Sequence, residues 1–245
     1  MNKNSWVDNH FVPAALILGL ALILTSFIAA GYLYKIRSLD NTISVVGSAK
    51  QRVTANSVKW TFNISRIVSE LNRKDGYAKM EKDTELIKKF LSNNLLTEKE
   101  YNIAPIMNEE IWHGDNYQGP RESTLREQIT IQSDNVKKIT DLANRTKDLV
   151  DQGVFLSSWP IEYYYSNLSE LRVSLLSKAI EDAKARATEI TKTTGKSVGD
   201  LKSAASGVVQ VLAPNSVDVS DYGQYDTTSL EKDIMVTVRA AFFVK

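Results

Sequence analysis

One run of 24 residues, from Phe11 to Tyr34, contains no charged side chain. As an α-helix it would extend about 36 Å, at about 1.5 Å per residue, which exceeds a hydrocarbon core of about 30 Å. A helix also satisfies its own backbone hydrogen bonds within lipid. Lys35 and Arg37 follow at the end where interfacial cations are expected. The sequence therefore predicts a transmembrane helix over residues 11–34 that contacts membrane lipid.

Two other interpretations of this run remain open. A cleavable signal peptide would use Ala29-Ala30-Gly31 as its small-residue cleavage site, although the apolar run is longer than the usual signal core of about 7–15 residues. A buried core helix is disfavoured because the run has no polar face. The signal-anchor interpretation is the one adopted.

The charges beside the run bear on its orientation. Lys35 and Arg37 after the run slightly outweigh Lys3 and the amino terminus before it. By the positive-inside rule alone, the following domain would stay in the cytoplasm.

Length and composition divide the chain into four segments. We expect a tail (1–10), the membrane helix (11–34), a linker (35–42) and a folded region (43–245), which is long enough to bury a core. The formal net charge of +1 provides no electrostatic footprint for nucleic acid. The absence of cysteine excludes disulfides and thiolate metal sites.

The periodicity of apolar residues after the linker predicts an α+β fold. Strands are expected in a hairpin at 42–68, at 100–112 and 123–132, at 154–165 and 198–212, and at the end of the chain, where Ile234, Val236, Val238, Ala240 and Phe242 share one face. Helices are expected at 72–95, 134–151 and 167–194. The order ββ-α-ββ-α-β-α-ββ indicates a mixed or antiparallel sheet.

Capping residues set the expected helix ends. Asn72 is expected to cap the first helix, and Ser133 or Asp134 the second. Gly153 and Gly195 suit a left-handed exit from the second and third helices. The third helix presents either a solvated face or a face that packs against another subunit.

Residues that could perform catalysis are sparse. His10 precedes the membrane helix and His113 lies in a loop, so a histidine-based triad, base or metal site would depend on His113 alone. Thr193-Thr194-Gly195-Lys196-Ser197 resembles the end of a phosphate-binding loop, but Ile190 stands where its first glycine belongs. The acidic pairs Glu109-Glu110 and Glu181-Asp182 are interpreted as surface charges. We therefore predict no catalytic, cofactor-binding or metal-binding residue.

Aromatic residues and polar loops provide the remaining candidates. Trp159 and Tyr163-Tyr164-Tyr165 lie on one expected strand, where alternating burial, stacking on a ligand or sugar, and an oligomer interface are all open. The loops 113–120 and 213–229 are polar and contain tyrosines, so they could form a ligand-binding or sensing module.

Three stretches resemble the SIMPL-domain family, formerly a domain of unknown function, over roughly residues 40–245. They are Ile43–Ala49 with the alternating strand to Ile64, Gly153–Ser166, and Lys178–Ala187 followed by Gly195–Gly199. Ala55-Asn56 departs from the Pro-Asp that the family often has at the first turn. The family has no established catalytic residues to carry over.

The resemblance implies an exported bacterial cell-envelope protein without a demonstrated enzymatic activity. It places the folded region in the periplasm or outside the cell, against the orientation that the local charges favour. It also implies a homo-oligomer and a role in stress tolerance. We therefore expect a non-enzymatic, membrane-anchored scaffold that self-assembles, with a ligand-binding module as the alternative and a hydrolase dependent on His113 as a third hypothesis.

Overall fold

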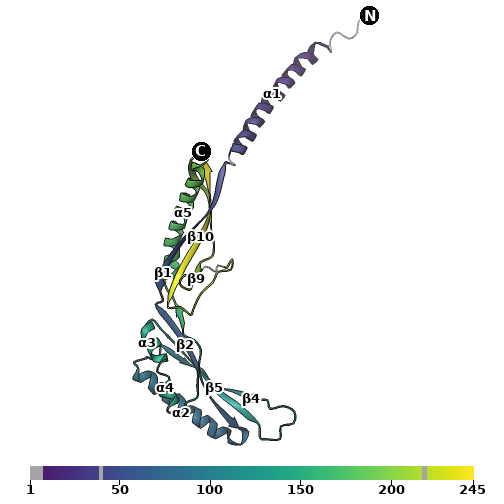
Figure 1. The fold of residues 1–245 in the computed structure, drawn as a ribbon. Coiled ribbons are helices and arrows are strands. Elements are labelled where there is room, and N and C mark those ends of the chain that lie inside the picture. Colours follow the sequence, from purple (N-terminus) through teal and green to yellow (C-terminus); the bar gives the residue numbers. More distant parts are fainter. Residues whose placement is uncertain (1–7, 39–40, 217–219) are drawn as a thin grey trace. The chain divides into compact units, whose positions relative to one another are not determined.

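The computed structural model describes residues 8–38, 41–216 and 220–245, and within the first helix the side chains of residues 12–35. It contains an N-terminal apolar helix, further helices and two β-sheets built from antiparallel strand pairs (Figure 1). The predicted α+β fold class is confirmed.

The helices and strands follow the predicted order. The helices are α1 (Asp8–Ser38), α2 (Arg73–Asn93), α3 (Val136–Ala143), α4 (Lys147–Val150) and α5 (Leu168–Lys192), with the 3-10 turn η1 (Glu70–Asn72) before α2. The strands are β1 (Thr42–Thr54), β2 (Ser57–Ser69), β3 (Tyr101–Ile103), β4 (Met107–Ile111), β5 (Glu122–Ser133), β6 (Leu156–Ser158), β7 (Glu162–Tyr164), β8 (Val198–Ser206), β9 (Gln210–Leu212) and β10 (Glu231–Val244).

The chain divides into two compact units. The first unit contains Met1–Ala49, Leu176–Gly207 and Thr237–Lys245, and the second contains Lys50–Leu175 and Val208–Val236. Each unit therefore combines segments that are distant in the sequence.

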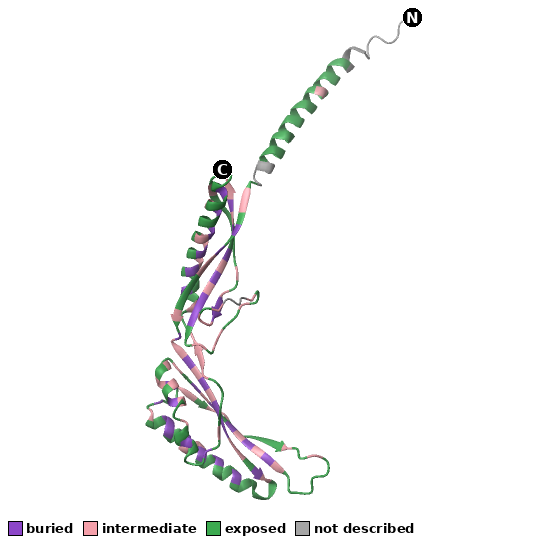
Figure 2. Ribbon diagram, in the orientation of Figure 1, coloured by how far each residue is buried: buried purple, intermediate pink, exposed green. Residues whose placement is uncertain are grey.

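The second unit is built on a six-stranded sheet. Its strand order is β3-β5-β2-β6, with β4 also paired to β5 and β7 to β2. β2 and β5 pair continuously from Val58↔Ser133 to Ser69↔Glu122. Alternate residues of β2, among them Trp60, Phe62 and Ile64, are buried in the core that α2 and α3 cover (Figure 2). This is the period-two alternation that the sequence predicts.

In the first unit, α5 packs closely on the sheet through small residues. β8 pairs with the C-terminal part of β10, and β1 lies on the other side of β10. Ala179, Ala183 and Ala187 of α5 are fully buried against apolar residues of β1 and β10. A Cβ at Gly47 would lie 2.1 Å from the Ala179 carbonyl oxygen, so strand and helix touch backbone to backbone there.

The prediction that residues 42–68 form a two-stranded hairpin is wrong, because the two strands do not pair with each other. β1 and β2 are consecutive strands, but they belong to different sheets. At the turn between them, Ala55 N–H donates to Leu230 O and Asn56 N–H donates to Tyr164 O. The turn residues therefore bond to distant segments, and β2 pairs with β5 along its length.

Several predicted elements are interrupted. The helix expected at 134–151 is two shorter helices, α3 and α4, separated by residues 144–146. Pro160 separates β6 from β7, and Pro105 lies between β3 and β4, because proline cannot donate to a strand ladder. The single strand expected at 198–212 is also divided. β8 ends at Ser206, the Gly207 N–H donates to Thr237 O, and β9 begins only at residue 210.

The helix ends agree with prediction only in part. Gly153 and Gly195 have φ of 87° and 69°, as expected for left-handed exits. α3, however, is capped by Asn135, which accepts from Lys138 N–H at 3.1 Å, and not by Ser133 or Asp134. Asn72 occupies the N-cap position of α2 without a side-chain capping bond.

Gly47→Ala tests the backbone contact between β1 and α5. The added methyl group must displace the α5 backbone, so we expect a loss of about 1–3 kcal/mol in the free energy of unfolding. Urea titration of the full chain measures it. Ser44→Ala, at an exposed position of the same strand, is the matched control and should change little. Equal effects of the two substitutions would contradict the contact.

Candidate functional site

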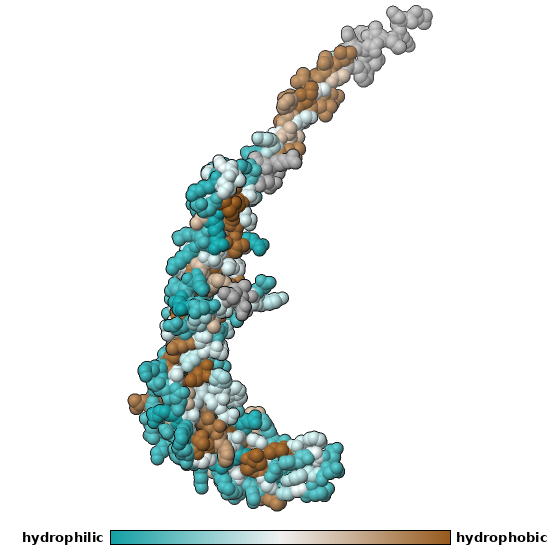
Figure 3. Space-filling model, in the orientation of Figure 1, coloured by the Kyte–Doolittle hydropathy of each residue, from teal (hydrophilic) through white to brown (hydrophobic). Residues whose placement is uncertain are grey.

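α1 is the most apolar feature of the molecule. Val12–Lys35 form one span that is long and apolar enough to cross a membrane. Its most apolar stretch is not buried against the rest of the described chain. Figure 3 shows hydrophobic side chains along this helix. By length and composition, it is either a membrane anchor or a signal sequence.

The loop 113–120 connects β4 to β5 and carries exposed aromatic residues. The rings of His113 and Tyr117 stack with centroids 4.3 Å apart, and His113 Nε2 lies 3.0 Å from a Glu122 carboxylate oxygen. Trp112, at the start of the loop, is 80% exposed. His113 is thus held by an aromatic ring and one carboxylate. Figure 1 shows this loop well apart from the β9–β10 loop of the same unit, so the two predicted loops do not form one site.

The loop 213–229 is anchored by a buried lysine at the start of β10. Lys232 is fully buried, and its ammonium group donates to the backbone oxygens of Asp226 and Ser229. The Asp226 carboxylate lies 3.8 Å from it and also accepts from Thr228. Burial lowers the pKa of Lys232, while Asp226 opposes that change. Residues 217–219 of the predicted loop lie outside the described residues.

A second ionic cluster lies beside this anchor. Asp233 is buried and accepts hydrogen bonds from Arg52, from Lys50 and from the backbone N–H of Asn215. The hydrogen bond from Arg52 is the main reason that the pKa of Asp233 lies well below its usual range. These clusters are not visible in the sequence because their members are up to 183 residues apart.

Three of the four acids in the predicted pairs have structural partners, and the fourth, Glu181, is exposed on α5. Glu109 lies 3.5 Å from Arg126, and Glu110 lies 3.6 Å from Arg121. Asp182 accepts from the backbone N–H of Ser48 at 2.8 Å, which, with Arg186, lowers its pKa. These carboxylates therefore carry the contacts of surface ion pairs and backbone anchors.

The stretch 193–197 follows the end of α5. Gly195 has the left-handed conformation of a helix exit, and Ser197 N–H donates to Lys245 O. A phosphate-binding loop needs a strand before it and a helix after it, whereas here a helix precedes and β8 follows. The helix-exit interpretation holds.

Sequence reasoning missed two acidic groups in the core of the second unit. Asp83 is buried and accepts two hydrogen bonds from the Arg66 guanidinium, one of them 2.8 Å long. Glu127 is buried and accepts from the Thr84 hydroxyl. The available signal was their place on the inward stripe of α2 and the inward face of β5.

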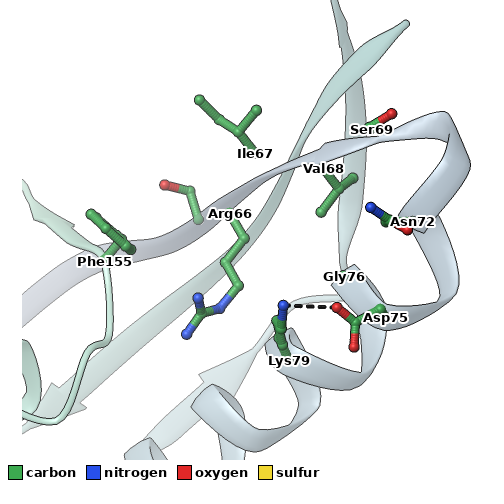
Figure 4. A pocket seen from close by; sticks show the side chains of 10 residues that line it. Arg66, Ile67, Val68, Ser69, Asn72, Asp75, Gly76, Lys79 and Phe155 are labelled. Carbon is green, nitrogen blue, oxygen red and sulfur yellow. Dashed lines mark ion pairs between the residues drawn. The ribbon is translucent and has the colours of Figure 1, made fainter. Parts of the chain in front are cut away.

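A hollow of about 460 Å³ lies between the end of β2 and the first turns of α2 (Figure 4). Arg66 and Val68 line it on the helix side, with the Lys79–Asp75 ion pair. Ile67 and Phe155 line its outer rim and are 67% and 69% exposed. Each cation that lines the hollow is paired with a carboxylate, so the hollow has little net charge with which to attract a ligand.

Within the described parts of the chain, no group of three or more histidine, aspartate or glutamate side chains is placed to hold a metal ion. Most of the acidic side chains described above form ion pairs or accept hydrogen bonds from backbone N–H groups.

Acid titration should reveal the contribution of Asp226. Burial alone would raise its pKa, but hydrogen bonds from Thr228 and Ser229 and the charge of Lys232 lower it to about 2. Because the folded-state pKa lies below the ordinary value of 3.8, this stability is present above about pH 4 and is lost as pH falls toward 2. The difference in Tm between the wild type and Asp226→Asn should therefore shrink between pH 4 and pH 2. A difference in Tm that is constant with pH would contradict the assignment. Asp233 is present in both proteins, so its own titration does not contribute to the difference.

Comparison with known proteins agrees with the fold. The SIMPL family profile, described as a protein of unknown function (DUF541), matches residues 43–242. A search of curated proteins found no match to this chain. The matched range covers both sheets and all the helices after α1. The chain therefore belongs to the SIMPL family.

Proposed function

We propose that this protein is a non-enzymatic scaffold of the bacterial cell envelope, tethered to the cytoplasmic membrane by α1 and self-assembling through its SIMPL region. The observation that carries the tether is the exposure of α1. Its apolar side chains have no protein partner within the described chain, and lipid is the environment that would bury them. The position outside the cytoplasm and a role in stress tolerance come from the family resemblance.

An exposed strand supports self-assembly. β8 is at an edge of its sheet, next to β10, and every residue from Asp200 to Ser206 is exposed. Val238 and Ala240 of β10 are buried, but the residues opposite them on β8, Ser206 and Ala204, are exposed. An uncovered edge strand presents backbone donors and acceptors to another chain, and a closed oligomer would cover them.

The acidic groups support a non-enzymatic role. Three of the four candidates for acid–base chemistry that the sequence offered are in contact with arginine or with a backbone N–H, namely Glu109, Glu110 and Asp182. The fourth, Glu181, is exposed on α5. The buried acids Asp83 and Asp233 are neutralised by arginine. A general acid or base needs a pKa near the working pH, whereas the pKa of Asp182 and of Asp233 lies below the ordinary value.

A ligand-binding or sensing module is the second candidate. The exposed Trp112 and the stacked rings of His113 and Tyr117 favour the loop 113–120 as its binding surface. This candidate has its own test, because a ligand that binds to the loop 113–120 of the folded chain raises the thermal stability, and Trp112→Ala should reduce that gain.

Arginine substitutions test the tether. Leu20→Arg with Ile23→Arg should cost about 5–7 kcal/mol of insertion free energy, at about 2.5–3.5 kcal/mol for each arginine near the helix centre. We expect the wild type to remain in the membrane pellet after alkaline extraction and the variant to be lost from it. Tyr34→Arg, at the end of the span, is the control and should be retained. A soluble mature chain beginning near Tyr32 would replace the tether with a cleaved signal.

Protease accessibility tests the side of the membrane. In spheroplasts, an added protease should digest the SIMPL region, and in inverted vesicles it should not. The opposite pattern would place this region in the cytoplasm, as the charges beside α1 favour.

Lysine substitutions on β8 test assembly. The full chain in micelles should have the mass of an oligomer by light scattering, and Leu201→Lys with Ala205→Lys should reduce it because edge charges oppose strand pairing. Ala185→Lys, on an exposed position of α5, is the matched control. A wild-type chain that stays monomeric at high concentration would refute self-assembly.

A further inference from the structure

The face of the second unit's sheet that lies opposite α2 and α3 is polar. Trp60, Phe62 and Ile64 of β2 point into the helix-covered core, so the residues between them point to the other face. These are Thr61 and Asn63. Together with Ser65, which follows Ile64 and has the same orientation, they form the centre of what we call the open face.

Strand register extends the open face across β5. Thr61 is opposite Thr130, and Asn63 is opposite Gln128. Directly opposed residues of antiparallel strands have side chains on the same face. The hydroxyls of Thr61 and Thr130 lie 3.5 Å apart, and the Gln128 amide nitrogen lies 3.4 Å from the Thr130 hydroxyl. The centre of the open face is thus a group of amides and hydroxyls.

Two exposed aromatic rings flank this centre along β6. Ser157 is opposite Asn63, so Phe155 and Trp159, two residues to either side, belong to the same face. The register continues through them, because Trp159 N–H donates to Thr61 O and Ser65 N–H donates to Phe155 O. Trp159 is 49% exposed and Phe155 is 69% exposed. At about 3.3 Å per residue, the two positions are about 13 Å apart.

The charges beside the polar centre of the open face form pairs. Lys59 lies 3.3 Å from Glu162, and Arg126 lies 3.5 Å from Glu109. All four residues are at the margins of the polar centre, one cation with each anion. The face is therefore complementary to an uncharged ligand, and it lacks the excess of cations that a phosphate-bearing polymer requires.

One buried amide on this face lacks a partner. Asn63 is only 8% exposed, and its side-chain oxygen has no hydrogen-bond partner in the structure. Buried polar atoms are normally paired, so an orphan acceptor indicates a missing donor. Gln128 beside it is exposed, and its side chain can turn away to admit a hydroxyl group.

We infer that the open face binds an uncharged oligosaccharide. A sugar ring has an apolar C–H face and a rim of hydroxyls, which match an exposed aromatic ring beside amide and hydroxyl groups. Rings of the oligosaccharide stack on Trp159 and Phe155. Its hydroxyls donate to Asn63 and bond with Gln128 and Thr61. This inference is independent of self-assembly, which uses β8 of the first unit.

The experiment uses the full chain in phospholipid nanodiscs, because sugar-headed detergents would compete. Chitohexaose and maltohexaose, both uncharged, are titrated in and followed by calorimetry and tryptophan fluorescence. We expect saturable binding of at least one of them. Trp159→Ala should weaken it about tenfold or more, and Trp159→Phe should retain most of it. Gln128→Ala, at an exposed position, should also weaken it without unfolding the chain.

Trp112→Ala is the matched control, since Trp112 is 80% exposed but follows the end of β4 and is not on the open face. It should bind like the wild type. Three results would overturn the inference. The first is that neither hexasaccharide binds at about 10 mM, which is ten times a weak Kd of about 1 mM. The second is that the Phe155→Ala, Trp159→Ala double variant binds as tightly as the wild type. The third is that an anionic hexasaccharide from heparin binds more tightly than the uncharged ones, which would mean that the surface recognises charge.

Discussion

The continuous antiparallel ladder between β2 and β5 is the interaction on which the second unit depends. It runs unbroken from Val58↔Ser133 to Ser69↔Glu122. A slip of one residue would turn the apolar side chains of β2 toward solvent and Asn63 into the core. The register therefore determines both the core beneath α2 and α3 and the composition of the open face. Every surface feature of this sheet follows from that choice.

The first unit is held together by a different kind of contact. Its core is small and rich in alanine, and the helix approaches the sheet closely at Gly47. Close approach of two backbones compensates for small side chains through many short dispersion contacts. β8 lies beyond this cover and stays exposed. β8 is thus left as an exposed strand at the edge of this sheet.

Ionic contacts in this protein act mainly as positional constraints. Asp233 and Lys232 are adjacent in β10, yet their charges are satisfied by different segments, Asp233 by residues of β1 and Lys232 by the loop before β10. An unpaired charge at either buried position would be costly, so each pair holds its segment in place. The loop 213–229 is held in this way near both ends, by Asp233 at the Asn215 backbone N–H and by Lys232 at the Asp226 and Ser229 oxygens. These buried charges hold segments of the fold in place, which agrees with the proposed scaffold role.

The sequence by itself determined the apolar helix, the α+β class, the strands β2, β5 and β10, and most of α2 and α5, because each depends on local periodicity or on a run without charge. Its resemblance to the SIMPL family was also correct. It misplaced the partner of β1 and joined α3 to α4. The burial of Asp83, Glu127 and Lys232 was also missed, although Asp83 and Glu127 lie at inward positions of the apolar pattern. Pairing, register and the partners of buried charges were decided only by the tertiary structure, because they depend on residues far apart in the chain. The open face is the clearest case, since its amides and aromatic rings come from β2, β5 and β6 and meet only when those strands pair.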